Sequence, residues 1–280
     1  MRQPDHVQRL DHARRAPVSA HHTTSWVVPT AARAVWQRFR ADSRAVPQAA
    51  WRQWQLVLGV GFVLTLFLSF GLPRLGQALQ DHGLQAWDIQ MLRWIASAGP
   101  LSFANAITWQ APGDLLFQPI FVLAFVLLAA WWSRPLIAAS MAAAYVLSFA
   151  FIWTGWGLWN RDRPDLIAGG IAAPGFHSFP SGHAVLTVVI YGLVAYLWVR
   201  ASQRWLERLL AIGIYIIWTA LVCTARLALG SHWPSDILAG LVIGLAWLTT
   251  IIVALRLAER AVHGNATLNE EKRAEGRGAA

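Results

Sequence analysis

Long apolar runs, separated by short polar segments, dominate the chain from about residue 53 to residue 255. The first run lies between Arg52 and Arg74, and its 21 uncharged residues are long enough to cross a bilayer as a helix. Five further runs have the same character. The pattern therefore predicts an all-α integral membrane protein, a bundle of six transmembrane helices at residues 55–72, 115–132, 136–159, 184–198, 209–225 and 237–255.

The connection between the first two predicted spans, residues 75–113, carries an apolar stripe at helical spacing. Its members are Leu84, Trp87, Met91, Leu92 and Ile95. Asp88 and Arg93 fall off that stripe. We expect an interfacial amphipathic helix lying along the membrane surface. A helix packed on the other helices fits the same pattern.

Both ends of the chain are polar and charged. Residues 1–52 are rich in arginine, and no apolar segment follows the start at signal-peptide distance, so we do not expect a cleaved secretion signal. We predict a disordered basic tail over 1–52, with helix only around 31–39, a membrane domain over 53–256, and a disordered C-terminal tail over 257–280.

Composition supports a bilayer partner and argues against a nucleic-acid partner. The chain is 56% hydrophobic with a mean hydropathy of +0.42, too apolar for an ordinary soluble domain. Its 17 tryptophans suit membrane–water interfaces. The net charge of +9 lies in tails and short loops rather than on one folded face, which is not the pattern of a nucleic-acid-binding domain.

The distribution of arginine predicts the topology. Six helices place both ends of the chain on one side, and that side also receives the loop arginines Arg134, Arg200, Arg204 and Arg208. Cytoplasmic loops carry the excess of basic residues. We therefore expect an inner-membrane protein with cytoplasmic N- and C-termini, and with the opposite loops on the periplasmic or extracellular side.

Three short polar islands lie in those outer loops, next to the ends of predicted helices. They span residues 160–164, 179–183 and 226–236. Ionisable groups beside lipid are energetically costly, so clusters of them are functional candidates. Because the topology puts all three islands on one side, we expect them to form one site.

The second island reads Pro180-Ser181-Gly182-His183 directly before an apolar helix. Ser181 suits an N-cap, and Gly182 allows close approach of the backbone to a ligand. The N-terminus of a helix attracts phosphate, and His183 would be placed to protonate a leaving group. An ordinary capped helix with a hydrogen-bonded histidine is the alternative.

The third island places His232 and Asp236 four residues apart at a helix start, on one helix face. A carboxylate there can hold the imidazole in one tautomer and leave its other nitrogen free to attack. Arg163 and Arg226 would bind phosphate oxygens and stabilise the transferring group. The alternatives are an interfacial His–Asp pair without chemistry and two arginines that reach toward the headgroups.

A metal site competes with this anion site, because imidazole and carboxylate are legitimate metal ligands. The residues concerned are His177, His183, His232 and Asp236. Two arginines in the same pocket would repel a dication, so we expect no metal and no other cofactor.

Together, the islands resemble the three-part signature of the type 2 phosphatidic acid phosphatase family, K-x6-RP, PSGH and SR-x5-H-x3-D. Arg163-Pro164 match the first part, residues 180–183 the second, and Arg226, His232 and Asp236 the third. The resemblance implies that His232 forms a phosphohistidine, Asp236 orients it, and His183 protonates the leaving oxygen. It implies phosphate binding by Arg163, Arg226 and the backbone of Ser181 and Gly182, without metal.

Two positions depart from the family pattern. Trp156 stands where the family has lysine, and Ala225 stands where it has serine. We expect Arg161 to supply the missing positive charge to the phosphate. The nucleophile, its carboxylate and the acid are all present.

The resemblance implies a lipid phosphatase acting on a phosphomonoester or diphosphate of a lipid. Phosphatidate, phosphatidylglycerol phosphate and undecaprenyl diphosphate fit, with a slight preference for the last by analogy. A phosphotransferase with the same site and a catalytically inactive membrane-binding protein remain alternatives. The haloperoxidase branch of the family ranks low, because its members are largely soluble.

Overall fold

The computed structural model describes residues 27–278 except 100, 115, 168–169 and 172–176, and leaves out the side chains of 27–32 and 266–278. Within this part of the chain the structure is mainly helical, without strands, as the sequence predicts. The helices are α1 (Val27–Ala45), α2 (Gln48–Leu79), α3 (Gln85–Ala98), α4 (Phe103–Gln110), α5 (Phe117–Trp131), α6 (Pro135–Leu158), α7 (Gly182–Ala201), α8 (Trp205–Ala228) and α9 (Pro234–Gly278).

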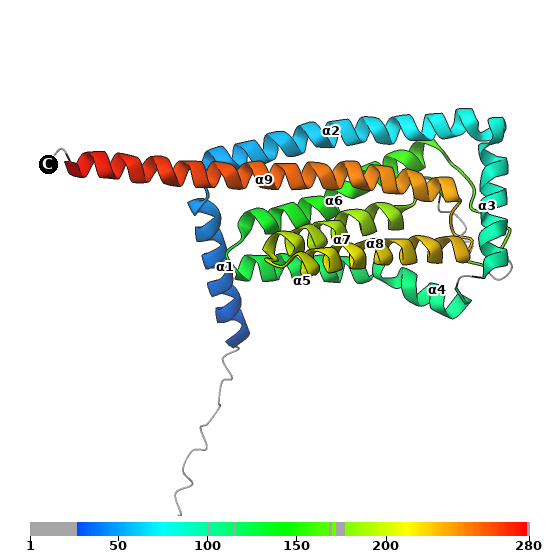
Figure 1. Ribbon diagram of the computed structural model, residues 1–280, viewed down its shortest axis with the longest axis horizontal. Coiled ribbons are helices and arrows are strands. Elements are labelled where there is room, and N and C mark those ends of the chain that lie inside the picture. The colour runs from blue at the N-terminus through cyan, green and yellow to red at the C-terminus, as the bar shows by residue number, and fades with distance from the viewer. Residues whose placement is uncertain (1–26, 100, 115, 168–169, 172–176, 279–280) are drawn as a thin grey trace, which may run out of the picture.

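Six helical stretches among the described residues are long and apolar enough to span a membrane, which confirms the six predicted spans. They contain α2, α5, α6, α7, α8 and α9, which run side by side as one bundle in Figure 1. Side chains such as Leu64, Phe67 and Ile217 are more than 60% exposed on the outside of that bundle. An apolar surface of this extent suits contact with lipid and not with water.

The core lies where α9 packs between α2 and α7. Phe151 and Trp247 fill it edge to face with ring centroids 5.2 Å apart, and both are fully buried. Gly240 lets the beginnings of α7 and α9 approach closely. A Cβ atom at Gly240 would lie 2.7 Å from the Ser181 carbonyl oxygen, so a larger residue there would push the two helix starts apart.

Helix α3 crosses the end of the bundle, roughly perpendicular to the spans (Figure 1). The chain bends at residues 80–84, where His82 and Gly83 leave helical geometry, and this bend redirects α2 into α3. The orientation agrees with the predicted interfacial helix, but the buried face differs. Trp87 is exposed, whereas Asp88, expected off the buried stripe, is fully buried.

The ends of the chain are more helical than expected. Instead of a disordered tail to residue 52, helix α1 occupies Val27–Ala45 and α2 already begins at Gln48. Helix α9 continues to Gly278, past residue 257, where a disordered tail was expected. The rest of the predicted N-terminal tail, residues 1–26, lies outside the described residues.

Candidate active site

The three polar islands meet at one end of the bundle. Helices α6 and α8 end there, and α7 and α9 begin there, because neighbouring spans run in opposite directions. Helices α3 and α4 lie at the same end, while α1 and the end of α9 lie at the opposite end (Figure 1). The islands are therefore close in space although they extend over residues 160–236 of the sequence.

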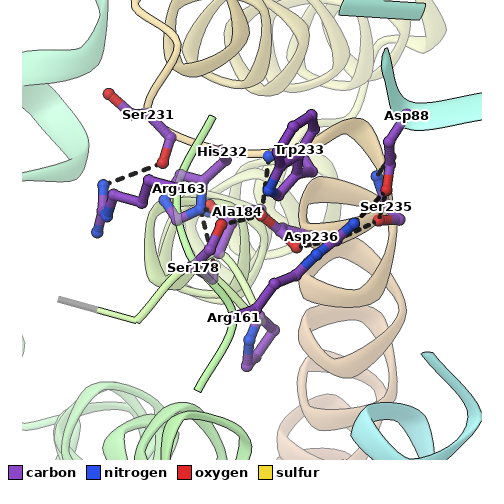
Figure 2. A network of polar contacts seen from close by, with 12 residues as sticks. Asp88, Arg161, Arg163, Ser178, Ala184, Ser231, His232, Trp233, Ser235 and Asp236 are labelled. Carbon is purple, nitrogen blue, oxygen red and sulfur yellow. Dashed lines mark hydrogen bonds and ion pairs between the residues drawn. The ribbon is translucent and has the colours of Figure 1, made fainter. Parts of the chain in front are cut away.

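His232 lies in the short connection between α8 and α9 and is only 2% exposed. Its Nδ1 is 2.9 Å from the carbonyl oxygen of Ser178 (Figure 2). Because a carbonyl oxygen can only accept, Nδ1 carries the proton and Nε2 keeps its lone pair. Gly230, with φ of +62°, makes the left-handed turn after α8 that leads into this connection.

Asp236, on the first turn of α9, is fully buried and accepts hydrogen bonds on both oxygens. Its Oδ2 accepts from the Trp233 backbone N–H at 2.8 Å and from the Ser178 hydroxyl. That oxygen is 3.6 Å from His232 Nδ1, too far for a hydrogen bond. The predicted direct orientation of the imidazole by the carboxylate is therefore replaced by the Ser178 carbonyl, with Asp236 as a nearby negative charge.

Arg161 does not face a phosphate site but is held between two carboxylates (Figure 2). It is 4% exposed and donates to Asp236 Oδ1 at 2.8 Å and to Asp88 Oδ2 at 2.6 Å. Asp88 also accepts from the backbone N–H and the hydroxyl of Ser235. The expectation that Arg161 binds phosphate is therefore not met, because its guanidinium already links α3 to the beginning of α9.

His183, on the first turn of α7, pairs with a residue that the sequence analysis missed. Its Nε2 lies 2.9 Å from Oδ1 of Asp114, which follows the turn at Ala111–Gly113. Tyr191 holds the same turn by donating its hydroxyl to the Pro112 carbonyl at 2.9 Å. The turn is thereby fixed against α7, and the carboxylate is fixed against the imidazole.

The contact between the turn and His183 requires a glycine at position 113, because a side chain there would meet the imidazole. A Cβ atom there would lie 2.7 Å from His183 Cδ2, so Gly113→Ala should displace the imidazole. We expect kcat to fall roughly tenfold or more, since small displacements of catalytic groups have effects of this order. Gly157→Ala is the matched control, because nothing lies within 4 Å of its added Cβ. Equal kcat values for the two variants would contradict the assignment.

Arg163 and Arg226 both lie near the two histidines. Each is close enough to interact electrostatically with His183 and with His232. Arg226 is 7% exposed and donates to the side-chain oxygen of Gln110, and its Nε is buried without a hydrogen-bond partner among the described residues. Arg163 donates to the Ser231 carbonyl at 3.0 Å (Figure 2). Two positive groups thus lie near both imidazoles.

Ser181 is the N-cap of α7, as predicted, and accepts from the Ala184 N–H at 3.4 Å. Its own N–H donates to the Asp236 carbonyl, so of the two expected backbone donors to phosphate only that of Gly182 is left. Trp156, at the position of the family lysine, donates its indole N–H to the Pro180 carbonyl at 3.2 Å. This hydrogen bond connects α6 to the second polar island.

The protonation state of His232 follows from its surroundings. Burial, with the positive charge of Arg226 adding to it, lowers the pKa of His232 to about 4, although Asp236 acts in the opposite direction. The imidazole is therefore neutral at pH 7. A neutral imidazole with a free lone pair is the form that can attack phosphorus.

This lowered pKa predicts how acid affects stability. Between pH 6.5 and about 4 the unfolded chain binds a proton at His232 that the folded chain does not. The contribution of the neutral His232 to the free energy of unfolding is therefore fully present above pH 6.5. It is lost as the pH falls toward 4. We expect the midpoint of thermal unfolding to decrease less over this range in His232→Gln than in the wild type. Parallel curves, followed by tryptophan fluorescence in detergent, would contradict the burial of a neutral imidazole.

The donor set does not resemble a metal centre. Among the described residues, no group of three or more His, Cys, Asp or Glu side chains is arranged to hold a metal ion. Asp236 is instead occupied by Arg161, Ser178 and the Trp233 backbone. The arrangement suits an anion that carries oxygen atoms.

Comparison with known proteins agrees with this description. Residues 136–260 match the family model of the PAP2 superfamily. A segment of 87 residues is 32% identical to phosphatidylglycerophosphatase B of Haemophilus influenzae, and 84 residues are 37% identical to the Escherichia coli protein of the same name. These segments cover 31% and 30% of this chain, and only 35% and 30% of the two relatives.

The fold is also similar to a solved structure, described as the first transmembrane PAP2 type phosphatidylglycerolphosphate phosphatase from Bacillus subtilis. The TM-score is 0.50 at 20% sequence identity, over 69% of this chain and 93% of that one. The two chains thus share a fold over this length. The stretch that matches the PAP2 superfamily, residues 136–260, holds all three polar islands.

Proposed function

We propose that this protein is an integral-membrane lipid phosphatase that removes a phosphate group from a lipid headgroup through a phosphohistidine at His232. The observation that carries the proposal is the buried neutral imidazole, whose Nδ1 is held by the Ser178 carbonyl while Arg163 and Arg226 lie within electrostatic reach. Such a group can attack phosphorus while the guanidiniums neutralise the phosphate oxygens.

The proposed reaction has two steps. First, His232 Nε2 attacks the phosphorus, a P–N bond forms, and the bond between phosphorus and the lipid oxygen breaks. His183, in its imidazolium form and with Nε2 paired to the Asp114 carboxylate, gives the proton on its other ring nitrogen to that leaving oxygen. Second, water attacks the phosphohistidine, His183 takes a proton from it, and inorganic phosphate leaves with His232 regenerated.

Asp236 supports both steps from a distance of 3.6 Å. Once His232 carries the phosphoryl group, its ring is positively charged, and a nearby carboxylate stabilises that charge. Arg161 and Ser178 keep Asp236 in position. The role of Arg161 is therefore to position the carboxylate.

The membrane setting indicates the kind of substrate. The site lies at one end of the bundle, beside α3 (Figure 1). The ends of membrane-spanning helices lie near the lipid headgroups, so the substrate is expected to be a headgroup phosphate. The names of the relatives point to phosphatidylglycerol phosphate, a phosphomonoester, which we place ahead of phosphatidate and undecaprenyl diphosphate. The arginine distribution favours a periplasmic site with both termini in the cytoplasm.

Release of inorganic phosphate from a panel of lipid phosphates tests this proposal. We expect phosphate release to be fastest with phosphatidylglycerol phosphate. Release should slow about 10²-fold in Arg226→Gln, because removing one donor that stabilises the transition-state charge has an effect of that size. Arg74→Gln, an exposed arginine on α2, is the control and should retain the wild-type rate. Transfer of the phosphoryl group to another acceptor without free phosphate would favour the phosphotransferase alternative.

The substitution at the lysine position motivates the inactive alternative. Trp156 cannot bind phosphate as lysine does, and its indole N–H already binds Pro180. A membrane-binding protein without catalysis would release no phosphate from any lipid in the panel, whereas an active phosphatase would also be inhibited by vanadate, a phosphate mimic. Loss of turnover on adding a chelator would reopen the metal mechanism.

A further inference from the structure

A cavity of about 580 Å³ lies at the end of the bundle opposite His232. It is bordered by the end of α5, the beginning of α6, the end of α7 and one residue of α9. Its walls are apolar, from Phe125, Leu128, Ile137 and Leu197, and its polar side chains are Arg134, Arg200 and Glu259. The cavity therefore combines an apolar interior with a charged rim.

The rim has an excess of positive charge. Arg200 forms an ion pair with Glu259, whose side chain also borders a neighbouring hollow with Arg256 and Arg260. Arg134 is exposed, and within the described part of the chain its side chain makes no ion pair or hydrogen bond. The cavity itself thus carries two guanidiniums and one carboxylate, and two further guanidiniums border the neighbouring hollow, so an anion would be bound favourably there.

The position of the cavity indicates that its ligand is a lipid. Trp132, 64% exposed, lies at its edge, as tryptophan does at the level of headgroups. Basic pockets between membrane helices bind the headgroups of anionic lipids, and the apolar walls would accept an acyl chain. A free phosphate ion would leave those apolar walls facing water.

We propose that this cavity, on the bilayer face opposite the catalytic site, binds one anionic phospholipid, with its phosphate at Arg134 and Arg200 and an acyl chain along Phe125 and Leu197. The site is separate from the phosphatase chemistry, so it does not depend on the function proposed for His232. A neutral zwitterionic phospholipid would bind more weakly, because the rim would gain no net attraction.

Native mass spectrometry of the full chain in detergent tests the proposal, with phosphatidylglycerol and phosphatidylcholine of the same acyl chains as probes. We expect phosphatidylglycerol to bind more tightly to the wild type, and Arg134→Gln to weaken that binding roughly fivefold. Ala201→Trp, which fills the cavity without a change in charge, should weaken binding to a similar degree. Arg204→Gln is the control, because Arg204 is exposed at the same end but does not border the cavity.

Three results would overturn the proposal. They are equal affinity for the two lipids, unchanged binding in both Arg134→Gln and Ala201→Trp, or an equal loss in Arg204→Gln, which would indicate general surface charge. Thermal unfolding of each variant shows that it remains folded. Phosphate release by Arg134→Gln at the wild-type rate would separate this site from catalysis.

Discussion

Replacing His232 with glutamine is expected to abolish phosphate release, with kcat lower by about 10³-fold or more, as for loss of a nucleophile. Glutamine can still donate to the Ser178 carbonyl through its amide, so the connection between α8 and α9 keeps its main contact. The glutamine amide, however, has no nitrogen lone pair available to attack phosphorus. The loss should therefore appear in kcat rather than in substrate affinity.

His177→Gln is the matched control for this experiment. His177 lies one residue before Ser178, at the same end of the bundle, but the proposed reaction does not use it. We expect it to retain turnover within a fewfold of the wild type under the same steady-state assay. Turnover by His232→Gln at a comparable rate would remove His232 as the nucleophile.

Replacing Arg161 with glutamine is expected to lower both stability and turnover. Asp88 and Asp236 are both fully buried, and both would lose their cation. Removing one partner of a buried ion pair destabilises a protein by about 3–5 kcal/mol. A displaced Asp236 would also stabilise the phosphorylated imidazole less well, so kcat should decrease.

Thermal unfolding and steady-state kinetics measure these two effects. Arg93→Gln is the control, since Arg93 is an exposed arginine on α3. Adding Asp88→Asn to Arg161→Gln should recover part of the lost stability, because one buried unpaired charge disappears. A higher KM with unchanged kcat and unchanged thermal midpoint would instead make Arg161 a phosphate-binding residue.

The six spans could be predicted because a membrane helix must satisfy its own backbone hydrogen bonds and face lipid with apolar side chains. Their ends were harder to predict. Helix α2 begins at Gln48, before Arg52, and α9 continues past Arg256, because polar residues extend a helix beyond the bilayer without an apolar signal. For the same reason, the sequence predicts only the middle of α1, around residues 31–39, and not its full extent.

The site was predictable where its residues follow one another in short motifs. The cap at Ser181 and the positions of His183, His232 and Asp236 depend on local sequence. Asp88 and Asp114 were missed as members because their partners are distant in sequence. Ser235 is 147 positions after Asp88, and His183 is 69 positions after Asp114. A carboxylate within a segment beside lipid was the available signal at Asp88.

Arg161 shows why charge alone did not predict a role. The absence of the family lysine suggested that Arg161 binds phosphate, but the perpendicular course of α3 brings Asp88 against it. Only the folded arrangement of α3 and α9 reveals that contact. Conversely, the Ser178 carbonyl binds His232 through the backbone, and side-chain spacing carries no information about it.

Isolation of the phosphorylated intermediate tests the central claim most directly. A lipid substrate labelled in its phosphate is mixed with the enzyme, quenched in alkali within milliseconds, and digested. We expect an acid-labile, alkali-stable label on the peptide that contains His232, and no label in His232→Gln. Label on another residue, or phosphate release with no labelled enzyme at any time, would contradict attack by His232.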